Sequence, residues 1–284
     1  MPVDHPAAED FVLANARLLE RHRLGALIHD APLSPVLAAL RAYRNDDGGF
    51  GHALEPDVRA PHSEPASVLH ALEVLADARA AGDPMVAGAA GWVAGVAGTD
   101  GAVPFVLDEA ASYPHAPWMT PTATGSFLTY AIVARLHELG HATAWRDQAT
   151  RWCWEHLAHA RSAGAYWIKF ALDFLDHVPD DDRLAPALDS LGSQLGADGS
   201  VPVPGGTADE RLGALDLSPR PGLRSRALFD GSVIERGLDA LEAGQTHDGG
   251  WTFDWLAWSA GQSVEWRGIV TYRALATLAA HRRG

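Results

Sequence analysis

The sequence has a single cysteine, Cys153, and a single lysine, Lys169. One cysteine excludes an internal disulfide framework and is compatible with a reducing compartment. Basic residues are scarce relative to acidic ones, and the formal net charge is −14. Nucleic acids and anionic membrane surfaces are bound through basic patches, so neither is an expected partner.

Long apolar runs and strand-like patterns are missing too. No stretch reaches the roughly 18 apolar residues of a membrane-spanning helix, and the first residues lack the basic and apolar regions of a signal peptide. No convincing alternation of apolar and polar residues is present, so sheets are not expected. Because 47% of the residues are hydrophobic and only 20% are charged, we expect one domain over residues 1–284, in the cytoplasm.

A glycine turn is what the sequence repeats. Residues 245–251 read Gln-Thr-His-Asp-Gly-Gly-Trp, and residues 44–50 repeat this spacing. Degraded copies at 99–103 and 197–201 keep the Asp-Gly pair, and a weak copy lies at 162–166. The corresponding glycines recur at intervals of about fifty residues or twice that, which indicates stacked supersecondary units. They are Gly48, Gly101, Gly199 and Gly249.

Helix-like spacing of apolar residues accompanies these turns, with Pro and Gly at the boundaries. It predicts helices at about 10–22, 34–43, 63–81, 84–96, 121–139, 144–160, 164–177, 182–195, 231–243 and 262–280, with a short one at 224–229. Successive helical hairpins can stay open or close into a ring, and a closed ring suits one domain of this size. We therefore predict an all-α fold: a single α/α toroid of about five to six helical hairpins with a central cavity.

The last glycine turn resembles the repeated motif of the terpenoid cyclase and protein prenyltransferase superfamily. That motif orders a basic residue, an apolar stretch, Gln, three spacers, Gly, any residue and Trp. The matching residues are Arg236, Gly237, Leu241, Gln245, Gly249 and Trp251. The resemblance implies the α/α toroid, and it implies that Gln245 and Trp251 are scaffold residues that tie an outer helix to an inner one.

The catalytic motifs of that superfamily are not repeated here. The Asp-x-Asp-Asp proton donor of squalene–hopene-like cyclases has only a distant counterpart at 179–182. The Asp-x-Cys zinc ligands of prenyltransferases are absent around Cys153, and so is the Cys-Gly-Glu-Gln thioester motif. His137 with His141, and His156 with His159, have helical spacing but no third ligand nearby. No metal and no cofactor are expected.

The loop after the first glycine turn carries the first group of candidate residues. Asp57 and Glu55 are the candidate acids, because a carboxyl kept neutral by apolar surroundings can protonate an alkene or an acetal. His52 is a candidate orienting or basic partner, and Arg59 could bind an anionic group. His62 and Glu64 are candidate binding residues. The alternative is a polar loop in which Arg59 pairs with an acid and Glu55 caps a helix.

Aromatic residues before the last helix form the second group. Trp255 and Trp258 are costly to leave in water, so they either pack into the core or hold a ligand. Aromatic faces stabilise cations and also stack on sugar rings. Asp254 and Glu265 lie near them in the sequence and are also candidate binding residues. Trp118, in another loop, is a further candidate aromatic binding residue.

Tyr166, Lys169 and Asp173 form the third group, because their spacing places them on one face of a helix. They either project into the cavity as binding residues or form an ordinary surface ion pair.

Three functions fit these observations. The first is an enzyme resembling terpenoid cyclases, in which Asp57 or Glu55 starts cation chemistry on an isoprenoid. The second is an α/α-barrel hydrolase that uses paired carboxylates on a sugar substrate. The third is a non-catalytic toroid that binds a small molecule or a protein partner. The sequence leaves the oligomeric state open.

Overall fold

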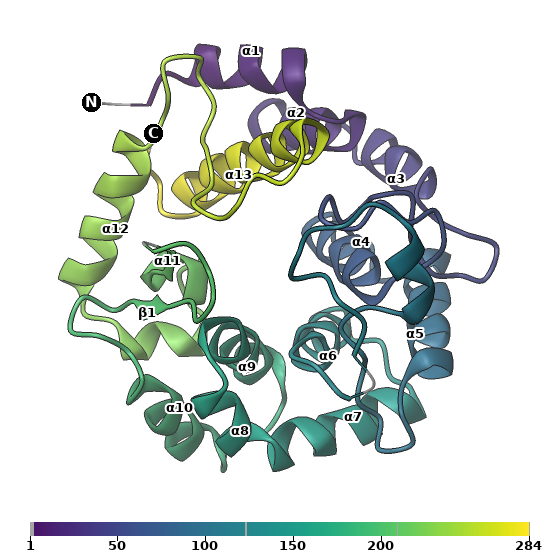
Figure 1. The fold of residues 1–284 in the computed structure, drawn as a ribbon. Helices are drawn as coiled ribbons and strands as arrows, with labels where there is room; N and C mark the ends of the chain where they lie inside the picture. Colours follow the sequence, from purple (N-terminus) through teal and green to yellow (C-terminus); the bar gives the residue numbers. More distant parts are fainter. Residues whose placement is uncertain (1–2, 123, 209, 284) are drawn as a thin grey trace. The chain divides into compact units, whose positions relative to one another are not determined.

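In the computed structural model, residues 3–122, 124–208 and 210–283 are described (Figure 1). The regular structure of the described chain is almost entirely helical, long loops join the helices, and the chain forms two compact units. Unit 1 comprises residues 1–39 and 192–284, and unit 2 comprises residues 40–191. The all-α class is confirmed, while the single domain and the closed toroid of five to six hairpins stay predictions.

Unit 2 is built on a row of three helices, with α6 (Leu128–Glu138) packed between α4 (Pro65–Asp77) and α9 (Ala165–His177). A second layer covers this row: α5 (Pro84–Val96) packs on α4, α7 (Ala144–Glu155) on α6 and α8 (Leu157–Ser162) on α9 (Figure 1). The 3-10 helix η1 (Asp108–Ser112) lies in the loop before α6. The divisions of the sequence between the two units fall within two helices, α3 (Ser34–Arg41) and α10 (Leu184–Gly192).

The middle of this row is the core of unit 2. Every residue of α6 from Leu128 to Leu136 is buried, and Tyr130 also donates a hydrogen bond to the backbone oxygen of Cys153 on α7 (2.9 Å). A helix that is buried on nearly all sides cannot slide or rotate cheaply. The side chains at the ends of α4, α6 and α9 are therefore held in fixed positions relative to one another.

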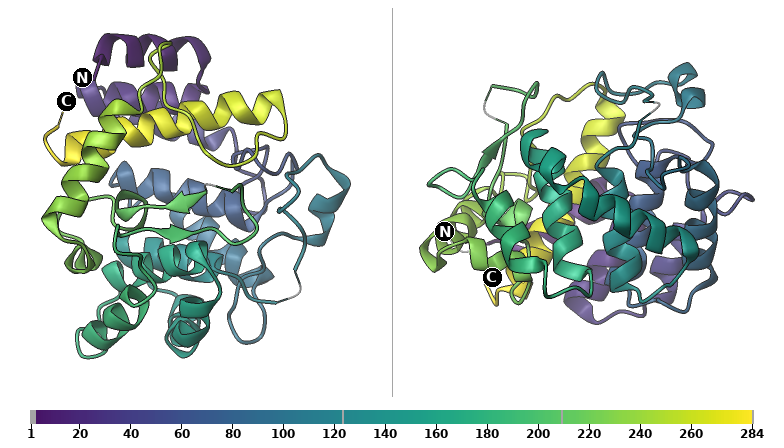
Figure 2. Two further views of the ribbon diagram at one scale, coloured as in Figure 1. Left: turned by 60° about the vertical axis from the view of Figure 1, so that its left-hand side comes forward. Right: turned by 90° about the horizontal axis from the view of Figure 1, so that it is seen from below.

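Unit 1 joins the first and last parts of the chain. Helix α13 (Ala260–Ala280) packs on α1 (His5–Asn15), α2 (Leu18–His29) and α12 (Gly231–Ala243). The remaining elements are short: α11 (Ala214–Leu217), η2 (Arg224–Leu228) and the antiparallel strands β1 (Val201–Pro202) and β2 (Arg211–Leu212), which Figure 2 shows as a small hairpin. This two-stranded pair corrects the prediction that sheets are absent.

The four glycine turns have the same geometry. Gly48, Gly101, Gly199 and Gly249 all have a left-handed φ, of 92°, 90°, 77° and 90°, which a glycine adopts without strain. In each copy the preceding aspartate accepts a hydrogen bond from the backbone N–H two residues further on. In each copy the N–H of the first turn residue also donates to the carbonyl of the fifth. The two degraded copies therefore adopt the same turn as the two complete ones. The weak copy differs, since Gly164 is the N-cap of α9.

Gln245 and Trp251 are structural, as the resemblance implies. The Gln245 amide exchanges two hydrogen bonds of 2.8 Å with the backbone of Asp4 and donates another to the carbonyl of Gly249 (2.9 Å). Trp251 Nε1 donates to the carbonyl of Leu241 on α12 (2.7 Å). The motif thus ties the last glycine turn both to the start of α1 and to the end of α12.

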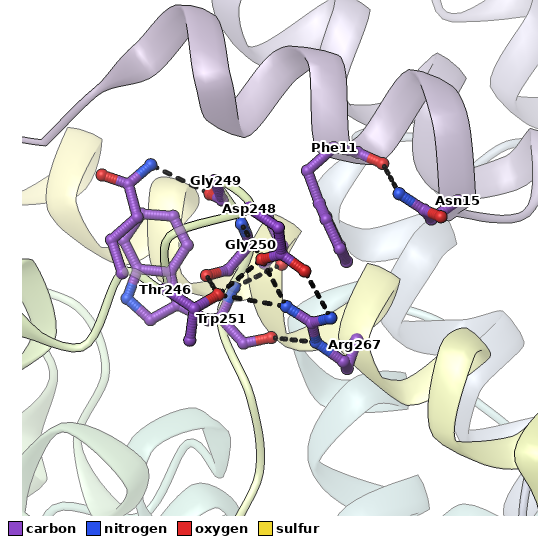
Figure 3. A network of polar contacts seen from close by, with 10 residues as sticks. Phe11, Asn15, Thr246, Asp248, Gly249, Gly250, Trp251 and Arg267 are labelled. Carbon is purple, nitrogen blue, oxygen red and sulfur yellow. Dashed lines mark hydrogen bonds and ion pairs between the residues drawn. The ribbon is translucent and has the colours of Figure 1, made fainter.

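Arg267 of α13 fastens the same turn from the other side. Figure 3 shows its guanidinium donating to both carboxylate oxygens of Asp248, each over 2.8 Å, and to Thr246 (3.1 Å). The guanidinium also lies 4.4 Å from the ring centroid of Phe11 on α1. This network connects α1, the turn and α13 within unit 1.

Several predicted helix boundaries need correction. The opening helix is two helices, because Ala16 and Arg17 are extended and Ala16 packs closely on Gly268 of α13. Helix α4 has Glu64, not Ser63, as its N-cap, because the Ser63 hydroxyl donates instead to Asp47 (2.8 Å).

Three further boundaries differ from the prediction. Helix α6 starts at Leu128 rather than near 121, because the segment before it is held by hydrogen bonds from Ser126 to the backbone of Val103. The helix predicted at 144–160 breaks at His156 into α7 and α8. The helix predicted at 182–195 ends at Gly192.

No helix in the described part of the chain combines the length and the apolar character that crossing a membrane requires.

Candidate functional site

The loop that carries the candidate acids is mostly buried, and backbone hydrogen bonds hold it around Asp57 and Arg59. The N–H of Arg59 donates to the carbonyl of Pro114 (2.9 Å), and the N–H of Ala116 donates to the carbonyl of Asp57 (2.8 Å). Asp57 is only 5% exposed. These contacts join the loop to the segment around Trp118, which stays 37% exposed. The candidate residues of this loop therefore have a fixed backbone.

Glu64 has the environment expected of a proton donor. Its side chain is buried, its Oε2 accepts a hydrogen bond from the N–H of Leu107 (3.1 Å), and its Oε1 has no hydrogen-bond partner. Burial raises the pKa of Glu64 to about 7, although the Leu107 N–H acts in the opposite direction, and the charge of Glu109 adds to the rise. A substantial fraction of Glu64 is therefore neutral at pH 7.

His62 lies beside this carboxyl. Its Nδ1 is 3.5 Å from Glu64 Oε1, and its ring meets the Tyr113 ring edge-on with the centroids 5.1 Å apart. Its Nε2 is buried without a hydrogen-bond partner. The sequence placed His62 and Glu64 among the binding residues, whereas their geometry suits proton transfer.

Glu55 is surrounded by groups that favour its charged form. His70 Nε2 lies 2.9 Å from Glu55 Oε2, and the N–H of Asp57 donates to Glu55 Oε1 (2.9 Å). Burial alone lowers the pKa of His70, but Glu55 and Glu73 outweigh burial and raise it to about 9. His70 is thus an imidazolium at neutral pH and Glu55 its carboxylate partner. This pairing weighs against Glu55 as a neutral donor.

The histidine beside Glu55 is therefore His70 and not the expected His52. His52 has a left-handed φ of 53°, is exposed, and places its Nε2 2.9 Å from Asn45 Oδ1. The positive φ turns this side chain towards the glycine turn.

Five partly exposed rings form an aromatic cluster in unit 2: Phe105, Phe127, Tyr166, Trp167 and Phe170. Phe127 is at its centre, with ring centroids 5.0 Å from Phe105, 5.9 Å from Tyr166 and 5.4 Å from Phe170. Exposed ring faces can bind an apolar chain and stabilise a cation. The segment from Phe105 to Leu107 joins this cluster to Glu64.

Tyr166 is the only member of the cluster that the sequence pointed to. Lys169 follows it on α9, with its Nζ 5.6 Å from the centroid of the Phe170 ring. Asp173, the third residue of this face, pairs with Arg135 of α6 and lies 3.4 Å from Nδ1 of His177. Along this face of α9, the side chains therefore change from the aromatic Tyr166 to the charged Lys169 and Asp173.

Solved structures resemble this chain over nearly its whole length. The type II terpene cyclase MstE from Scytonema matches with a TM-score of 0.55 and 14% identity, over 96% of this chain and 97% of that one. A variant of MstE in complex with its substrate, geranylgeranyl dihydroxybenzoate, matches with a TM-score of 0.55 and 13% identity, over 97% and 96%. The fold is that of a type II terpene cyclase. The predicted resemblance to terpene cyclases is confirmed.

The crystal structure of a protein from Actinoplanes also matches this chain, with a TM-score of 0.56 and 16% identity over 96% of this chain and 98% of that one. Neither a family model nor a curated protein matches the sequence. At such identities the terpene-cyclase fold is shared, and the chemistry has to be argued from the site.

The second candidate group lies in unit 1 of the terpene-cyclase fold and packs largely on itself. The Trp255 ring stacks on Phe253 (4.6 Å) and meets Trp266 edge-on (5.0 Å). The Asp254 carbonyl accepts a hydrogen bond from Thr207 (2.8 Å). Trp258 and Glu265 are half-buried.

Sequence reasoning missed most of the charged residues at the ends of α4, α6 and α9. They are His70, Glu73, Asp77, Arg135, Glu138 and His177. Their spacing of three, four or seven residues within each helix was visible, but solvated helix faces show the same spacing. Three of the four histidines considered for metal binding have other partners: His137 Nε2 lies 3.0 Å from the Thr150 hydroxyl, His156 Nδ1 lies 2.8 Å from the carbonyl of Trp152, and His159 meets the Trp167 ring.

Proposed function

We propose that the protein protonates an isoprenoid alkene and guides the resulting carbocation to a cyclic product, with Glu64 as the acid. The observation that carries this proposal is the buried Glu64 carboxyl, whose pKa is raised to about 7 and whose Oε1 has no hydrogen-bond partner. Such an oxygen can carry the acidic proton and donate it to an apolar substrate. The terpene-cyclase fold supports the proposal.

The proton balance of this step is simple. The O–H bond of Glu64 breaks, its proton forms a C–H bond with the electron pair of the alkene, and a tertiary carbocation remains on the substrate. Glu64 is left as a carboxylate. A neighbouring double bond of the substrate then closes the ring. The last cation loses a proton to water, and Glu64 regains a proton from the solvent, so no oxidant or reductant is needed.

The aromatic cluster has the second role in this proposal. Phe105, Phe127 and Phe170 are half-buried, and Phe105 belongs to the segment that holds Glu64. Their negative π faces stabilise a cation without reacting with it. Asp57 remains a second candidate acid, because it is also buried, and it is tested together with Glu64.

The test is incubation of the purified protein with geranylgeranyl dihydroxybenzoate, squalene and geranylgeranyl diphosphate, with products analysed by mass spectrometry. We expect one of them to be converted into a cyclic isomer. In D₂O the product should carry one non-exchangeable deuterium. Glu64→Gln should lower the rate by at least about a hundredfold, the size typical of general-acid catalysis.

Asp57→Asn distinguishes the two acids, and Asp108→Asn is a matched control because Asp108 is exposed beside Leu107. Full activity in Glu64→Gln with loss in Asp57→Asn would move the acid to Asp57. An oligosaccharide panel is run in parallel. Cleavage of a glycoside, with no isoprenoid product, would replace the cyclase by the hydrolase.

A further inference from the structure

The first glycine turn differs from the other three in the side chain at its first position. That residue is Asn45, Gly98, Gly196 and Thr246 in chain order. Gly98 and Gly196 show that the turn forms without any side chain at this position. The Thr246 hydroxyl lies 2.6 Å from each of two oxygen atoms of its own turn. The Asn45 amide is therefore not needed to form the turn, and its partners outside the turn indicate its role.

The Asn45 amide bonds to the segment that leads into the acid. Its Nδ2 donates to the carbonyl of Pro61 (3.1 Å) and to Oγ of Ser63 (3.0 Å). Ser63 is buried and directly precedes Glu64. We call residues 61–64 the acid segment. Asn45 thus holds the acid segment at two points just before the carboxyl-bearing residue.

Further contacts fasten the same turn to the acid segment. The Ser63 hydroxyl donates to Oδ1 of Asp47 (2.8 Å), and the N–H of Glu64 donates to the carbonyl of Phe50 (2.9 Å). A Cβ at Gly51 would lie 2.1 Å from a carbonyl oxygen of the acid segment. The two stretches of chain are therefore in direct backbone contact, and the acid segment has little freedom to shift.

His52 determines which way the Asn45 amide faces. Its Nε2 lies 2.9 Å from Asn45 Oδ1. An amide oxygen only accepts hydrogen bonds, so Nε2 carries the proton and the amide nitrogen faces the acid segment. The left-handed backbone at His52 (φ 53°) is strained for a residue other than glycine, and it brings the ring back to the turn. The hydrogen bonds therefore run in one direction, from His52 through Asn45 to the Ser63 hydroxyl.

We propose that three residues position the Glu64 carboxyl for proton transfer, acting through the acid segment rather than on the substrate: His52, Asn45 and Ser63. The proposal rests on the proposed function and adds to it the residues that hold the acid. A displacement of a reacting group by about 1 Å can slow a reaction about a hundredfold. Loss of one link should therefore affect the chemical step more than substrate binding.

The test measures kcat, KM and the pKa of Glu64 in Ser63→Ala and Asn45→Ala. The kinetics use the isoprenoid that the unmodified protein cyclises. The pKa comes from a carbon NMR titration of the glutamate carboxyl groups, in which the Glu64 signal is identified by its absence from Glu64→Gln. We expect kcat to fall about tenfold or more and KM to change by less than about twofold.

The pKa of Glu64 should change in a definite direction. Burial raises it to about 7 in the unmodified protein. A loosened acid segment admits water to the carboxyl, so the pKa should fall towards the ordinary value of 4.5. A residue that only stabilises the fold would not move this value in the folded variant.

His52 allows a rescue experiment, because it is exposed and its substitution leaves the buried residues in place. His52→Leu removes the donor to Asn45 and should lower both kcat and the pKa of Glu64. His52→Gln retains an N–H at the end of the side chain and should restore both. Thr246→Ala is the matched control at the same position of the last glycine turn. It should leave kcat and the pKa of Glu64 unchanged, even where it lowers the melting temperature.

The outcomes separate this proposal from the proposed function, because the NMR titration needs no substrate. A lowered pKa of Glu64 in Ser63→Ala and His52→Leu, without conversion of any isoprenoid by the unmodified protein, would support the hold on the carboxyl and contradict the cyclase. Cyclisation at the same kcat in the unmodified protein, Asn45→Ala and His52→Leu would overturn the positioning role and leave the cyclase intact. Equal effects in Thr246→Ala would also overturn it. If Ser63→Ala does not fold, the two His52 variants decide.

Discussion

The backbone N–H of Leu107 donates its hydrogen bond to Oε2 of Glu64 over 3.1 Å, across 43 residues of sequence. The bond stabilises the carboxylate form, so it opposes the rise in pKa that burial causes. The loop before α6 therefore sets how readily the carboxyl at the start of α4 gives up its proton. Activity that depends on neutral Glu64 should decline as the pH rises through about 7.

Leu107→Pro tests this relationship, because proline removes the N–H. Leu107 has φ −82° and ψ 152°, which proline adopts without strain. Loss of the hydrogen bond should raise the pKa of Glu64 further, so the decline in activity should move to higher pH. Leu107→Ala keeps the N–H and should keep the pH profile of the unmodified protein. An unshifted profile in Leu107→Pro would show that the bond does not tune the acid.

This relationship marks the limit of prediction from sequence. The glycine turns were predictable because Asp, Gly and their hydrogen bonds lie within five residues of one another. Helices α5 and α12 were predicted with their observed bounds, because Pro84, Gly231 and Gly244 mark their boundaries locally. The environment of Glu64 depends on residues more than forty positions away, and no local pattern indicates it.

The partner of Glu55 is a second feature that the sequence could not predict. His52 is the near neighbour in sequence, but the left-handed backbone at His52 turns its ring to Asn45. His70 reaches Glu55 because it lies on the second turn of α4, and the helix bounds had to be known before that contact could be seen. The same applies to Arg135 and Asp173, which belong to different helices.

His70 should make stability depend on pH. Its pKa is raised to about 9 in the folded protein, against about 6.5 in an unfolded chain. The stabilisation by the imidazolium is therefore fully present below pH 6.5 and is lost as the pH rises to 9. The shift corresponds to at most about 3 kcal/mol.

Urea denaturation at pH 7.5 and pH 9.5 checks this. These values lie above most of the titration of Glu64, whose pKa of about 7 would otherwise contribute. The unmodified protein should lose more stability between them than His70→Gln. An equal loss in both proteins would assign the pH dependence to other groups.

Gly249 should tolerate no side chain. A Cβ there would lie 2.1 Å from the carbonyl oxygen of Ala7 on α1, and the Gly249 φ of 90° is strained for an L-residue. Gly249→Ala should therefore destabilise unit 1 by several kcal/mol, since α1 must move away. Gly261 is the matched control, because a Cβ at this helical position meets nothing within 4 Å. Gly261→Ala should be neutral or stabilising by up to about 1 kcal/mol. Thermal unfolding of both variants measures the difference.

The aromatic cluster can be tested for cation stabilisation apart from its apolar surface. Phe127→Leu keeps an apolar side chain of similar reach but removes the π face at the centre of the cluster. A cation–π contact in a partly desolvated site contributes about 1–2 kcal/mol, so kcat should fall roughly tenfold while KM changes little. Substrate binding depends on apolar area, which leucine retains, whereas only the transition state carries the positive charge. A rise in KM at unchanged kcat would instead make Phe127 a binding residue and place the cation elsewhere.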